Sequence, residues 1–470
     1  MQKMTTREFL KRLGCGGAAL AGGRLLGDEA LHEPLPPGDY IADPKYGTCR
    51  YIRDIPKFPV DVPSAFLKDG KVVQPAREVE VFRRADVAVV GGGPAGFAAA
   101  LASARTGAKT VLVERYGSLG GLFTNGLVLI LIGTAEGVRG GRQRLVTAGI
   151  CRELMARAQA MGAGVYRTDR HHGPYQPTID PEGAKVLMDR MARAEKNLEV
   201  VFHCWGVDVV QDGPAVKGVV FESKQGRQAV LAKRVVDCTG DGDVAFQAGA
   251  DFRQVTHNIG FVYRLGNVGK ASGRELTDPA ADGFPKAPNE PAPGAFWKNG
   301  LGPQGNGCSV EDLTRAEFLH REEMWRLVER MRATPGYRDT FVMNSCSQVG
   351  VRATRLIRTD HTLAMADTNA RTAFADAVGM SGDDTFTRGA FQIPYRTLLP
   401  SGVENLLVAG RAIGVAPDVI DRARLIPVCL VTGEAAGTAA ALSVRAGVAP
   451  RALDAGALRR TLAANGACLA

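Results

Sequence analysis

The stretch that most constrains this chain lies near residue 90, where a strand, a glycine turn, a helix and a second strand follow one another. Residues 86–90 read Asp-Val-Ala-Val-Val and run into Gly-Gly-Gly-Pro-Ala-Gly at 91–96, after which we expect an alanine-rich helix up to Gly107. A second apolar strand at 109–113 ends at Glu114. This order predicts a βαβ unit that binds an ADP moiety.

Each residue type in this unit has a physical role. Gly91 allows the tight turn, Gly93 lets the backbone approach a pyrophosphate, and Gly96 lets the helix pack closely on the strand. The free N–H groups at the helix start, near Pro94, would face the phosphates. Glu114 follows at roughly the 20-residue spacing at which a carboxylate accepts hydrogen bonds from the adenosine ribose. The unit therefore predicts a bound dinucleotide.

The loop after Glu114 distinguishes between dinucleotides. It reads Arg-Tyr-Gly-Ser-Leu-Gly-Gly at 115–121, so that two glycines, Gly120 and Gly121, are adjacent. An NAD enzyme needs no such pair here, whereas a longer cofactor must run its pyrophosphate and ribityl chain along the loop, and glycines allow that close contact. The doublet resembles that of FAD-dependent oxidoreductases with the glutathione-reductase-like FAD fold.

Later segments extend this resemblance from about residue 75 to the C-terminus. Residues 234–243, Arg-Val-Val-Asp-Cys-Thr-Gly-Asp-Gly-Asp, resemble the "ATG" segment of that superfamily, with Cys238 in place of the alanine. Residues 403–411 resemble its C-terminal FAD strand and turn. The helix expected from Val428 to Arg445 resembles the one that points its N-terminus at the flavin's pyrimidine edge, where its dipole would stabilise reduced flavin. In similar folds a residue near Val207 offers backbone hydrogen bonds to adenine.

The resemblance implies an α/β fold, with a Rossmann-like FAD-binding domain on a mainly parallel sheet and an inserted α+β substrate or cap domain. We expect the FAD-binding domain at 76–255 and 391–470 and the inserted domain at 256–390. Residues 1–23 are a signal-like segment, and 24–75 are an irregular extension rich in proline and charge. The expected FAD contacts are Gly91, Gly93, Pro94, Ala95, Gly96, Glu114, Arg115, Gly120, Gly121, Val207, Thr239, Gly240, Gly410, Arg411, Arg424, Leu425 and Ile426.

Composition limits the remaining functions. The chain has 470 residues, of which 45% are hydrophobic and 23% charged, as in ordinary globular proteins, and this length predicts two domains. Its net charge of +9 is scattered, so no nucleic-acid surface is expected. The longest strongly apolar run, Leu127 to Ile132, is too short to span a membrane. The nine cysteines include no CxxC pair, so we expect no metal site and no dithiol relay.

The N-terminus leaves the location of the protein open. Residues 5–11 resemble a twin-arginine export signal in which Glu8 replaces the second arginine, and a weakly apolar Gly/Ala stretch follows at 13–23. The segment is an export signal, a degraded signal or an unrelated helix. The protein would accordingly be cytoplasmic, or periplasmic if the signal is functional.

Because flavin carries the redox chemistry, the catalytic candidates are side chains that place a substrate or move protons. His257 lies where the chain leaves the first FAD segment, and it is either a proton donor or acceptor or a structural histidine. Arg352, Arg355 and Arg358 have helical i, i+3 spacing and would share one face, either a carboxylate clamp or an ion-pair face. Arg352 is preferred because Gly-Val-Arg-x-x-Arg resembles a family segment that faces the active site.

Three further candidates lie near the return to the FAD domain. Arg388 and Tyr395 occur at the domain junction, where residues often line the cleft. Arg424 precedes the last long helix. It would either tune the flavin through its charge near the N1/O2 edge or form a structural ion pair with Asp418 or Asp421.

Together these features predict an FAD-dependent oxidoreductase that transfers hydride between a small organic substrate and flavin N5, with an unidentified electron acceptor or donor. One alternative is a redox-neutral isomerase or lyase that uses flavin as a transient electron store or structural part. Another is a binding protein that kept the fold and lost catalysis, although the intact glycines and Glu114 argue against loss of the cofactor. The sequence leaves the substrate and the oligomeric state open.

Overall fold

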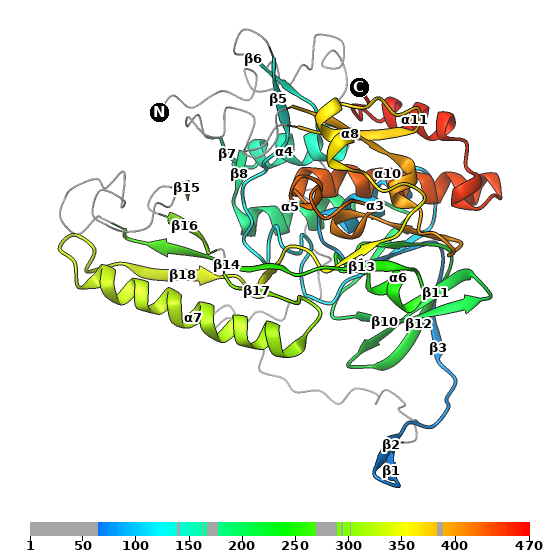
Figure 1. The fold of residues 1–470 in the computed structure, drawn as a ribbon, viewed down its shortest axis with the longest axis horizontal. Coiled ribbons are helices and arrows are strands. Elements are labelled where there is room, and N and C mark those ends of the chain that lie inside the picture. The colour runs from blue at the N-terminus through cyan, green and yellow to red at the C-terminus, as the bar shows by residue number, and fades with distance from the viewer. Residues whose placement is uncertain are drawn as a thin grey trace, which may run out of the picture.

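The computed structural model describes residues 64–138, 142–162, 164–166, 177–268, 289–292, 295–300, 302–382 and 389–470. The signal-like segment 1–23 and the candidate Arg388 lie outside the described residues. The extension expected at 24–75 is described from Ser64 onward. There, β1 (Phe66–Lys68) and β2 (Lys71–Val73) form an antiparallel hairpin that stands away from the main body (Figure 1).

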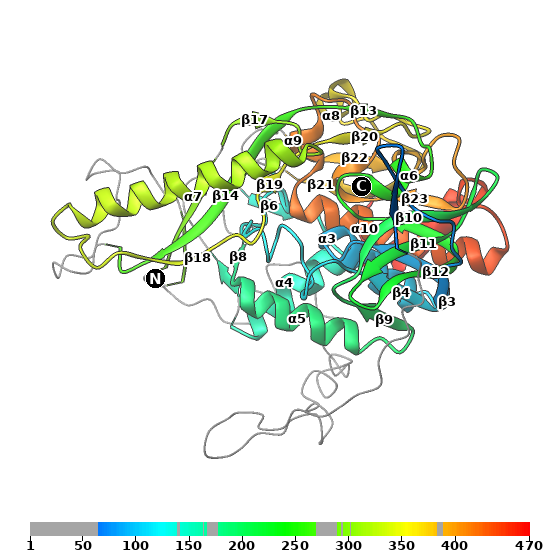
Figure 2. The same cartoon turned by 90° about the horizontal axis from the view of Figure 1, so that it is seen from below.

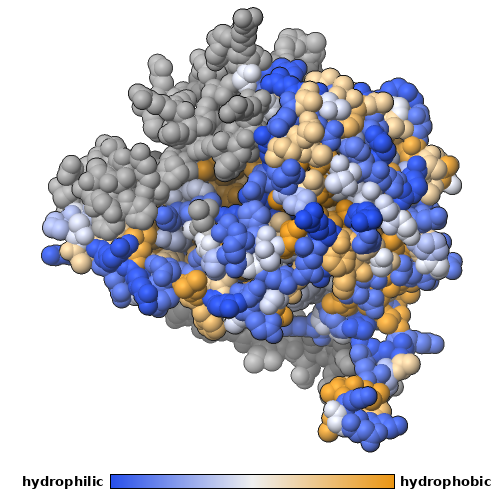
Figure 3. Space-filling view, in the orientation of Figure 1, coloured by the Kyte–Doolittle hydropathy of each residue, from blue (hydrophilic) through white to orange (hydrophobic). Residues whose placement is uncertain are grey.

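The β1–β2 hairpin carries apolar side chains on its surface (Figure 3). Phe66, Leu67 and Val72 are 50%, 74% and 78% exposed. Lys68 and Lys71 pair across the strands next to the turn. A two-stranded ribbon of this length is marginally stable by itself.

The centre of the fold is a seven-stranded sheet in the order β10-β11-β12-β3-β4-β9, with β23 paired to β12. Its strands are β3 (Glu80–Val90), β4 (Thr110–Val113), β9 (Leu198–Val201), β10 (Trp205–Asp212), β11 (Ala215–Ser223), β12 (Gly226–Asp237) and β23 (Leu406–Val408). All pairs among β3, β4, β9, β12 and β23 are parallel, whereas β10 and β11 form an antiparallel edge. Val87, Val89 and their neighbours at the end of β3 are buried on both faces, as in parallel sheets covered on each side. The predicted α/β fold is confirmed.

The helices described are α3 (Pro94–Arg105), α4 (Ile150–Ala160), α5 (Pro181–Arg193), α6 (Asp243–Gln247), α7 (Val310–Arg332), α8 (Met365–Ala370), α9 (Ile420–Ala423), α10 (Ile426–Ala446) and α11 (Ala455–Ala464). By length and composition α10 could cross a membrane, but its apolar window is entirely buried inside the protein. It packs along α3 (Figure 1). A Cβ on Gly433 or Gly437 would lie 2.0 Å from the backbone oxygen of Ala95 or Ala99, so these glycines bring the two helices together.

A second sheet lies to one side of the first, as seen from below in Figure 2. Its strands are β14 (His257–Gly266), β15 (Asn289–Ala292), β16 (Ala295–Gly300), β17 (Gln304–Gly305), β18 (Phe341–Ser345) and β19 (Gly350–Val351). A separate hydrophobic cluster joins this sheet to α7 through side chains such as Phe261, Val328 and Met331. Leu129 and Ile130 join the same cluster from the loop after the glycine doublet. The second sheet is therefore packed against the loop that follows the glycine doublet.

The remaining strands form three small hairpins and one short pair. They are β5 (Ala135–Val138) with β6 (Arg142–Leu145), β7 (Gly164–Tyr166) with β8 (Pro177–Ile179), β21 (Ala377–Ser381) with β22 (Phe391–Pro394), and β13 (Phe252–Gln254) with β20 (Arg355–Ile357). The short 3-10 helices are η2 (Tyr395–Leu398), η3 (Gly410–Ala412) and η4 (Pro450–Ala452).

The predicted helical face of Arg352, Arg355 and Arg358 is wrong. Their segment is extended, because β19 pairs with β14 and β20 pairs with β13. In extended backbone, residues three apart point to opposite faces. Arg355 pairs with Asp243 at 2.8 Å, Arg358 pairs with Asp251 at 3.0 Å on the surface, and Arg352 reaches the cavity described below.

Candidate functional site

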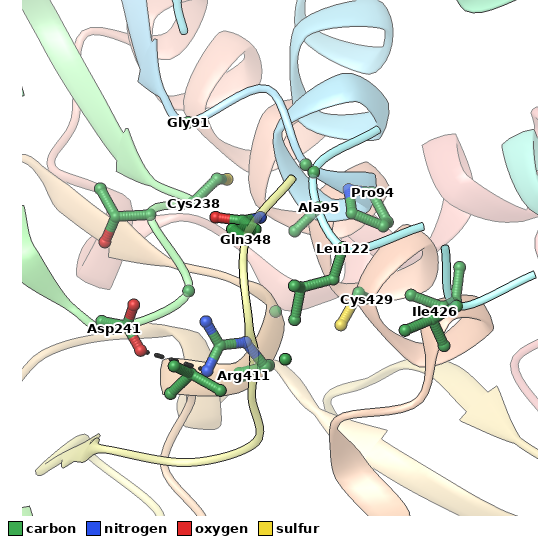
Figure 4. A pocket seen from close by; sticks show the side chains of 18 of the residues that line it. Gly91, Pro94, Ala95, Leu122, Cys238, Asp241, Gln348, Arg411, Ile426 and Cys429 are labelled. Carbon is green, nitrogen blue, oxygen red and sulfur yellow. Dashed lines mark hydrogen bonds and ion pairs between the residues drawn. The ribbon is translucent and has the colours of Figure 1, made fainter. Parts of the chain in front are cut away.

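A cavity of about 350 Å³ lies where the parallel strands of the main sheet end. Val90 and Val113, the last residues of β3 and β4, line it, and so does Cys238 just after β12 (Figure 4). The second sheet adds Gly260 of β14 and Trp297 of β16 to the wall. Because ligands of open α/β sheets bind outside the carboxyl ends of the strands, this cavity is the candidate functional site.

The turn between β3 and α3 brings bare backbone to the cavity. Gly91 has a φ of +94°, and a Cβ on it would lie 2.5 Å from the carbonyl oxygen of Cys238. A Cβ on Gly96 would lie 1.6 Å from the oxygen of Gly91. Gly93 is the N-cap of α3 and makes no side-chain capping bond, and the first helical turn holds no acidic residue. The N–H groups of this turn can therefore receive an anion.

The paired glycines of the next loop run beside this turn. Gly120 donates its backbone N–H to the oxygen of Gly92 at 2.8 Å. Gly121 has a φ of +49°, and its Cβ would lie 2.9 Å from the Cα of Gly93. Side chains are thus excluded from the gap between the two segments, which suits close contact with an extended ligand.

Glu114 follows β4 and lines the cavity. Its carboxylate accepts hydrogen bonds from the backbone N–H groups of Gly92 and Tyr116, the latter at 2.7 Å. Burial raises the pKa of this carboxyl, and the two backbone bonds oppose that effect. The turn therefore holds the carboxylate in a fixed position, where it can accept hydrogen bonds from ligand hydroxyl groups.

A stacked group stands beside Glu114. The guanidinium carbon of Arg115 lies 4.7 Å from the centre of the Tyr116 ring and 5.3 Å from that of Trp205. Gln348 joins them from the second sheet side, because its Oε1 accepts hydrogen bonds from Arg115 at 2.8 Å and from the Tyr116 hydroxyl at 2.5 Å. All four side chains line the cavity.

The loop after β12 adds an ion pair. The buried carboxylate of Asp237 accepts hydrogen bonds from the backbone and hydroxyl of Thr239 at 3.0 and 2.7 Å, and burial raises its pKa to about 6. Gly240 leaves room for Arg411, since a Cβ there would lie 2.5 Å from an Arg411 nitrogen. Arg411 pairs with Asp241 at 3.1 Å (Figure 4). Asp237 thus shapes the loop, and the pair presents both charges to the cavity.

The start of α10 forms a further part of the wall. Leu425 caps the helix without a side-chain bond, and its first turn holds no acidic residue. Arg424 donates from Nε and Nη2 to Oδ1 of Asp421 at 2.9 and 2.6 Å. The same oxygen lies 3.2 Å from Nε2 of His257. Burial lowers the pKa of His257 below 6.5 although Asp421 opposes this, so the imidazole is neutral at pH 7.

This geometry agrees with a family comparison. Residues 86–462 match the family described as FAD dependent oxidoreductase. The chain belongs to this family. It is therefore an enzyme of the oxidoreductase class that binds FAD. The site fits a dinucleotide of this kind. The N-termini of α3 and α10 lack side-chain caps, glycines keep the gap between the two loops free of side chains, and the carboxylate of Glu114 lines the cavity.

Comparison with solved structures gives distant matches. The chain is similar to p-nitrophenol 4-monooxygenase from Pseudomonas putida DLL-E4, at 15% identity and a TM-score of 0.43, over 82% of this chain and 89% of that chain. It is similar to a geranylgeranyl bacteriochlorophyll reductase-like protein from Thermoplasma acidophilum (15%, 0.40, 81% and 83%). It is also similar to the flavin-dependent brominase Bmp2 (13%, 0.42, 81% and 83%). A comparison with curated proteins gave no match.

Most of the residues expected to contact FAD line the cavity of this FAD-dependent oxidoreductase. They are Gly91, Gly93, Pro94, Ala95, Glu114, Arg115, Gly121, Thr239, Gly240, Gly410, Arg411, Arg424, Leu425 and Ile426, together with the catalytic candidate Arg352. Gly96 and Gly120 do not line it but shape the two loops that do.

Three other expected site residues do not line the cavity. Val207 lies at a β-bulge between β10 and β11 and does not line the cavity, whereas its neighbours Trp205 and Gly206 do. Tyr395 is buried elsewhere, with its hydroxyl donating to the oxygen of Pro450 at 2.9 Å. His257 contacts Asp421 rather than the cavity wall.

Sequence reasoning missed several residues of the wall. Asp241 stands inside the Thr-Gly-Asp-Gly-Asp segment, so this motif could have identified it. Gln348, 233 positions from Arg115, carries no local signal. Gly260 and Trp297 come from strands of the second sheet, whose register no motif records.

Proposed function

We propose that this oxidoreductase transfers hydride between a small organic substrate and the isoalloxazine N5 of FAD held in this cavity. The supporting observation is that one cavity is lined by the glycine turn of α3, by the start of α10 and by the second sheet. A cofactor that extends from the first to the second of these elements would meet a substrate against the third. FAD supplies the hydride chemistry, and the protein supplies position, charge and exclusion of water.

The residues at the nucleotide end have separate proposed roles. The N-terminus of α3 would hold the pyrophosphate and Glu114 the adenosine ribose. Arg115 and Trp205 would lie beside the adenine, because they stack next to Glu114 at the cavity edge. The uncapped start of α10, with Arg424 next to it, would face the pyrimidine edge of the flavin.

His257 is better explained as a positioning residue than as a proton donor or acceptor. It does not line the cavity, and it reaches Arg424 through the carboxylate of Asp421. A neutral imidazole leaves that carboxylate free to orient Arg424. We therefore assign to His257 and Asp421 the task of holding Arg424 in place.

The two predicted domains correspond to the two sheets in this proposal, with one shift of boundary. Ala353, Leu356 and Val378 bury their side chains in the same hydrophobic cluster as the main sheet. We therefore place the inserted substrate layer at about 257–351, and the residues that follow in the FAD-binding part.

The test is anaerobic reduction of the purified flavoprotein. A panel of alcohols, amines, sugars and hydroxy acids is added, and loss of the oxidised flavin absorbance is followed, with a subsequent screen of electron acceptors. We expect at least one compound class to bleach the flavin without added reductant. That result contradicts the redox-neutral isomerase or lyase alternative, whereas a colourless protein that cannot take up FAD contradicts the main proposal.

A further inference from the structure

One side chain from the second sheet side reaches the nucleotide end of the cavity. Gln348 lies between β18 and β19, and its Oε1 accepts hydrogen bonds from Nη2 of Arg115 at 2.8 Å and from the hydroxyl of Tyr116 at 2.5 Å. Arg115 and Tyr116 directly follow Glu114, whose carboxylate is bonded to the backbone N–H of Gly92. Gln348 is therefore joined by direct hydrogen bonds to the segment that carries the ribose carboxylate of the proposed FAD site.

These hydrogen bonds fix which end of the Gln348 amide faces Arg115. A guanidinium has N–H donors and no acceptor, so the group that faces it must be the amide oxygen. The amide nitrogen, with its two N–H donors, is then directed away from Arg115. Figure 4 shows this nitrogen on the side of Ala95 and Pro94, at the start of α3. Gln348, Pro94 and Ala95 all line the cavity.

The amide nitrogen of Gln348 is available to a ligand at the start of α3. Among the described residues, none accepts a hydrogen bond from Nε2. The first turn of α3 holds no acidic residue, and its N-cap Gly93 makes no side-chain bond. Because the N–H groups of this turn and the amide nitrogen are all donors, the ligand group that suits them is an anion with several acceptor oxygens. Within FAD, that group is the pyrophosphate.

The backbone on both sides of Gln348 is held in place. The N–H of Ser347 donates to the oxygen of Asn125, in the loop after the glycine doublet, at 2.9 Å. The N–H of Val349 donates to Oε1 of Glu317 on α7 at 3.0 Å. The position of Gln348 is therefore fixed relative both to α7 and to the loop after the glycine doublet. A donor held in this way loses little conformational freedom when a ligand binds.

We propose that Gln348 is a cofactor-binding residue whose Nε2 donates a hydrogen bond to the pyrophosphate of FAD, together with the N–H groups at the start of α3. Arg115 and Tyr116 act as positioning residues, because they hold the amide oxygen and thereby direct the nitrogen toward the phosphates. The inference rests on the proposed placement of FAD along α3 and is independent of hydride transfer. It makes the second sheet part of the FAD site.

Two substitutions separate a donor to FAD from a side chain that only bonds Arg115 and Tyr116. Gln348→Glu keeps an oxygen for these two partners but replaces the N–H donors with an oxygen of a charged carboxylate. Gln348→Met removes both hydrogen-bonding ends. We expect Gln348→Glu to raise the Kd for FAD at least about tenfold and to bind FAD more weakly than Gln348→Met, because repulsion from the pyrophosphate adds to the lost bond. If Gln348→Glu binds FAD as tightly as Gln348→Met or more tightly, the proposal is overturned.

ADP is the second probe, because it carries the diphosphate without the flavin. Calorimetric titration of each apoprotein with FAD and with ADP should give the same order of affinities for both ligands. A loss in Gln348→Glu for FAD but not for ADP would contradict a contact with the diphosphate. Gln304→Glu is the matched control, since Gln304 is exposed on β17 of the same sheet and does not line the cavity. It should leave both Kd values unchanged, and an equal loss there would contradict the proposed contact.

Urea unfolding of each apoprotein shows whether the variant is folded. If Gln348→Glu does not fold, Gln348→Met decides: weaker ADP binding supports the proposal, and unchanged binding contradicts it. The two proposals can also fail separately. If no compound reduces the flavin but Gln348→Glu weakens FAD binding as expected, the hydride-transfer proposal is wrong and the Gln348 contact stands. If a compound reduces the flavin and Gln348→Glu binds FAD no more weakly than Gln348→Met, the hydride-transfer proposal stands and the Gln348 contact is wrong.

Discussion

The nucleotide end and the second-sheet end of the cavity depend on the sequence in different ways. At the nucleotide end, the cavity wall is formed by two short continuous segments, the turn 91–96 and the loop 114–121, in which residues adjacent in the sequence form the site together. At the second-sheet end, Gly260 and Trp297 come from two strands and Arg352 follows a third, so that the register of these strands brings the three residues to the cavity. The first end presents largely backbone to the cavity, and the close approach of that backbone requires glycines. The second end also presents side chains to the cavity, and many different sequences can bring such side chains together.

The largest expected effect tests whether FAD binding at the nucleotide end depends on close contact with the backbone. Gly91→Ala should abolish FAD binding and lower the free energy of unfolding by about 3 kcal/mol or more. The new Cβ would clash with the backbone that follows β12, and the alanine would also have to adopt a positive φ. Gly107→Ala is the control: its φ of +99° is similar, but a Cβ there meets open space. It should keep FAD and cost about 1 kcal/mol. The FAD content and the urea unfolding of both variants are measured. If the two variants lose FAD and stability equally, backbone strain rather than close approach is what matters at Gly91.

The next effect concerns a buried group of α10 that does not line the cavity and that no motif reveals. Glu434 on α10 accepts the backbone N–H of Ile150, the first residue of α4, at 2.9 Å. Burial raises its pKa from 4.5 to about 7. A carboxyl with a raised pKa in the folded state binds its proton more tightly there, so its ionisation costs stability as pH rises from 4.5 through 7.

Glu434→Gln should therefore be more stable than the wild type at pH 8 by up to about 3 kcal/mol, and the difference should vanish near pH 4. Urea unfolding of both proteins across this pH range measures it. Taking the difference between the two proteins removes the parallel contribution of Asp237, whose pKa is also raised. A variant that is less stable at every pH would mean that the carboxylate is needed in its ionised form.

A smaller effect tests the ribose assignment at the nucleotide end. Glu114→Gln keeps an acceptor oxygen but loses the charge, so the Kd for FAD should rise about tenfold, as when a charged hydrogen bond becomes neutral. Glu199→Gln on the neighbouring strand β9 is the control, since Glu199 pairs with Arg83 away from the cavity. Titration of each apoprotein with FAD measures the Kd of both variants. If the two variants bind FAD equally well, Glu114 does not contact the ribose.

The smallest effect sharpens the description of the second-sheet end. Protonated His257 would compete with Arg424 for Asp421, so flavin reduction by a substrate should change about two- to fivefold as pH falls below 6.5. His257→Gln should remove this dependence and leave FAD content unchanged. His361→Gln is the control, because His361 faces Asp367 instead. A pH profile that survives in His257→Gln would exclude the positioning role.

Prediction from sequence succeeded where one local pattern implies one geometry. The βαβ unit around Gly91 and the glycine doublet have the expected turns, because positive φ and close backbone contact exclude other residues. It failed for the arginines after Gly350, since i, i+3 spacing suits a helix face but the segment is extended by pairing with β13 and β14. It also did not predict the β-bulge at Val207, because a bulge is decided by pairing with the partner strand.

The sequence by itself determined the α/β fold, the family and the FAD cofactor, because a dinucleotide imposes its shape on a few contiguous residues. Tertiary structure decided which charges meet. It placed Arg352 along β14 and near Arg424, and it tied His257 to Asp421 across 164 positions of the chain. The physical reason is that a glycine turn acts through its own backbone, whereas a charged pocket exists only after distant strands have paired and brought its side chains together.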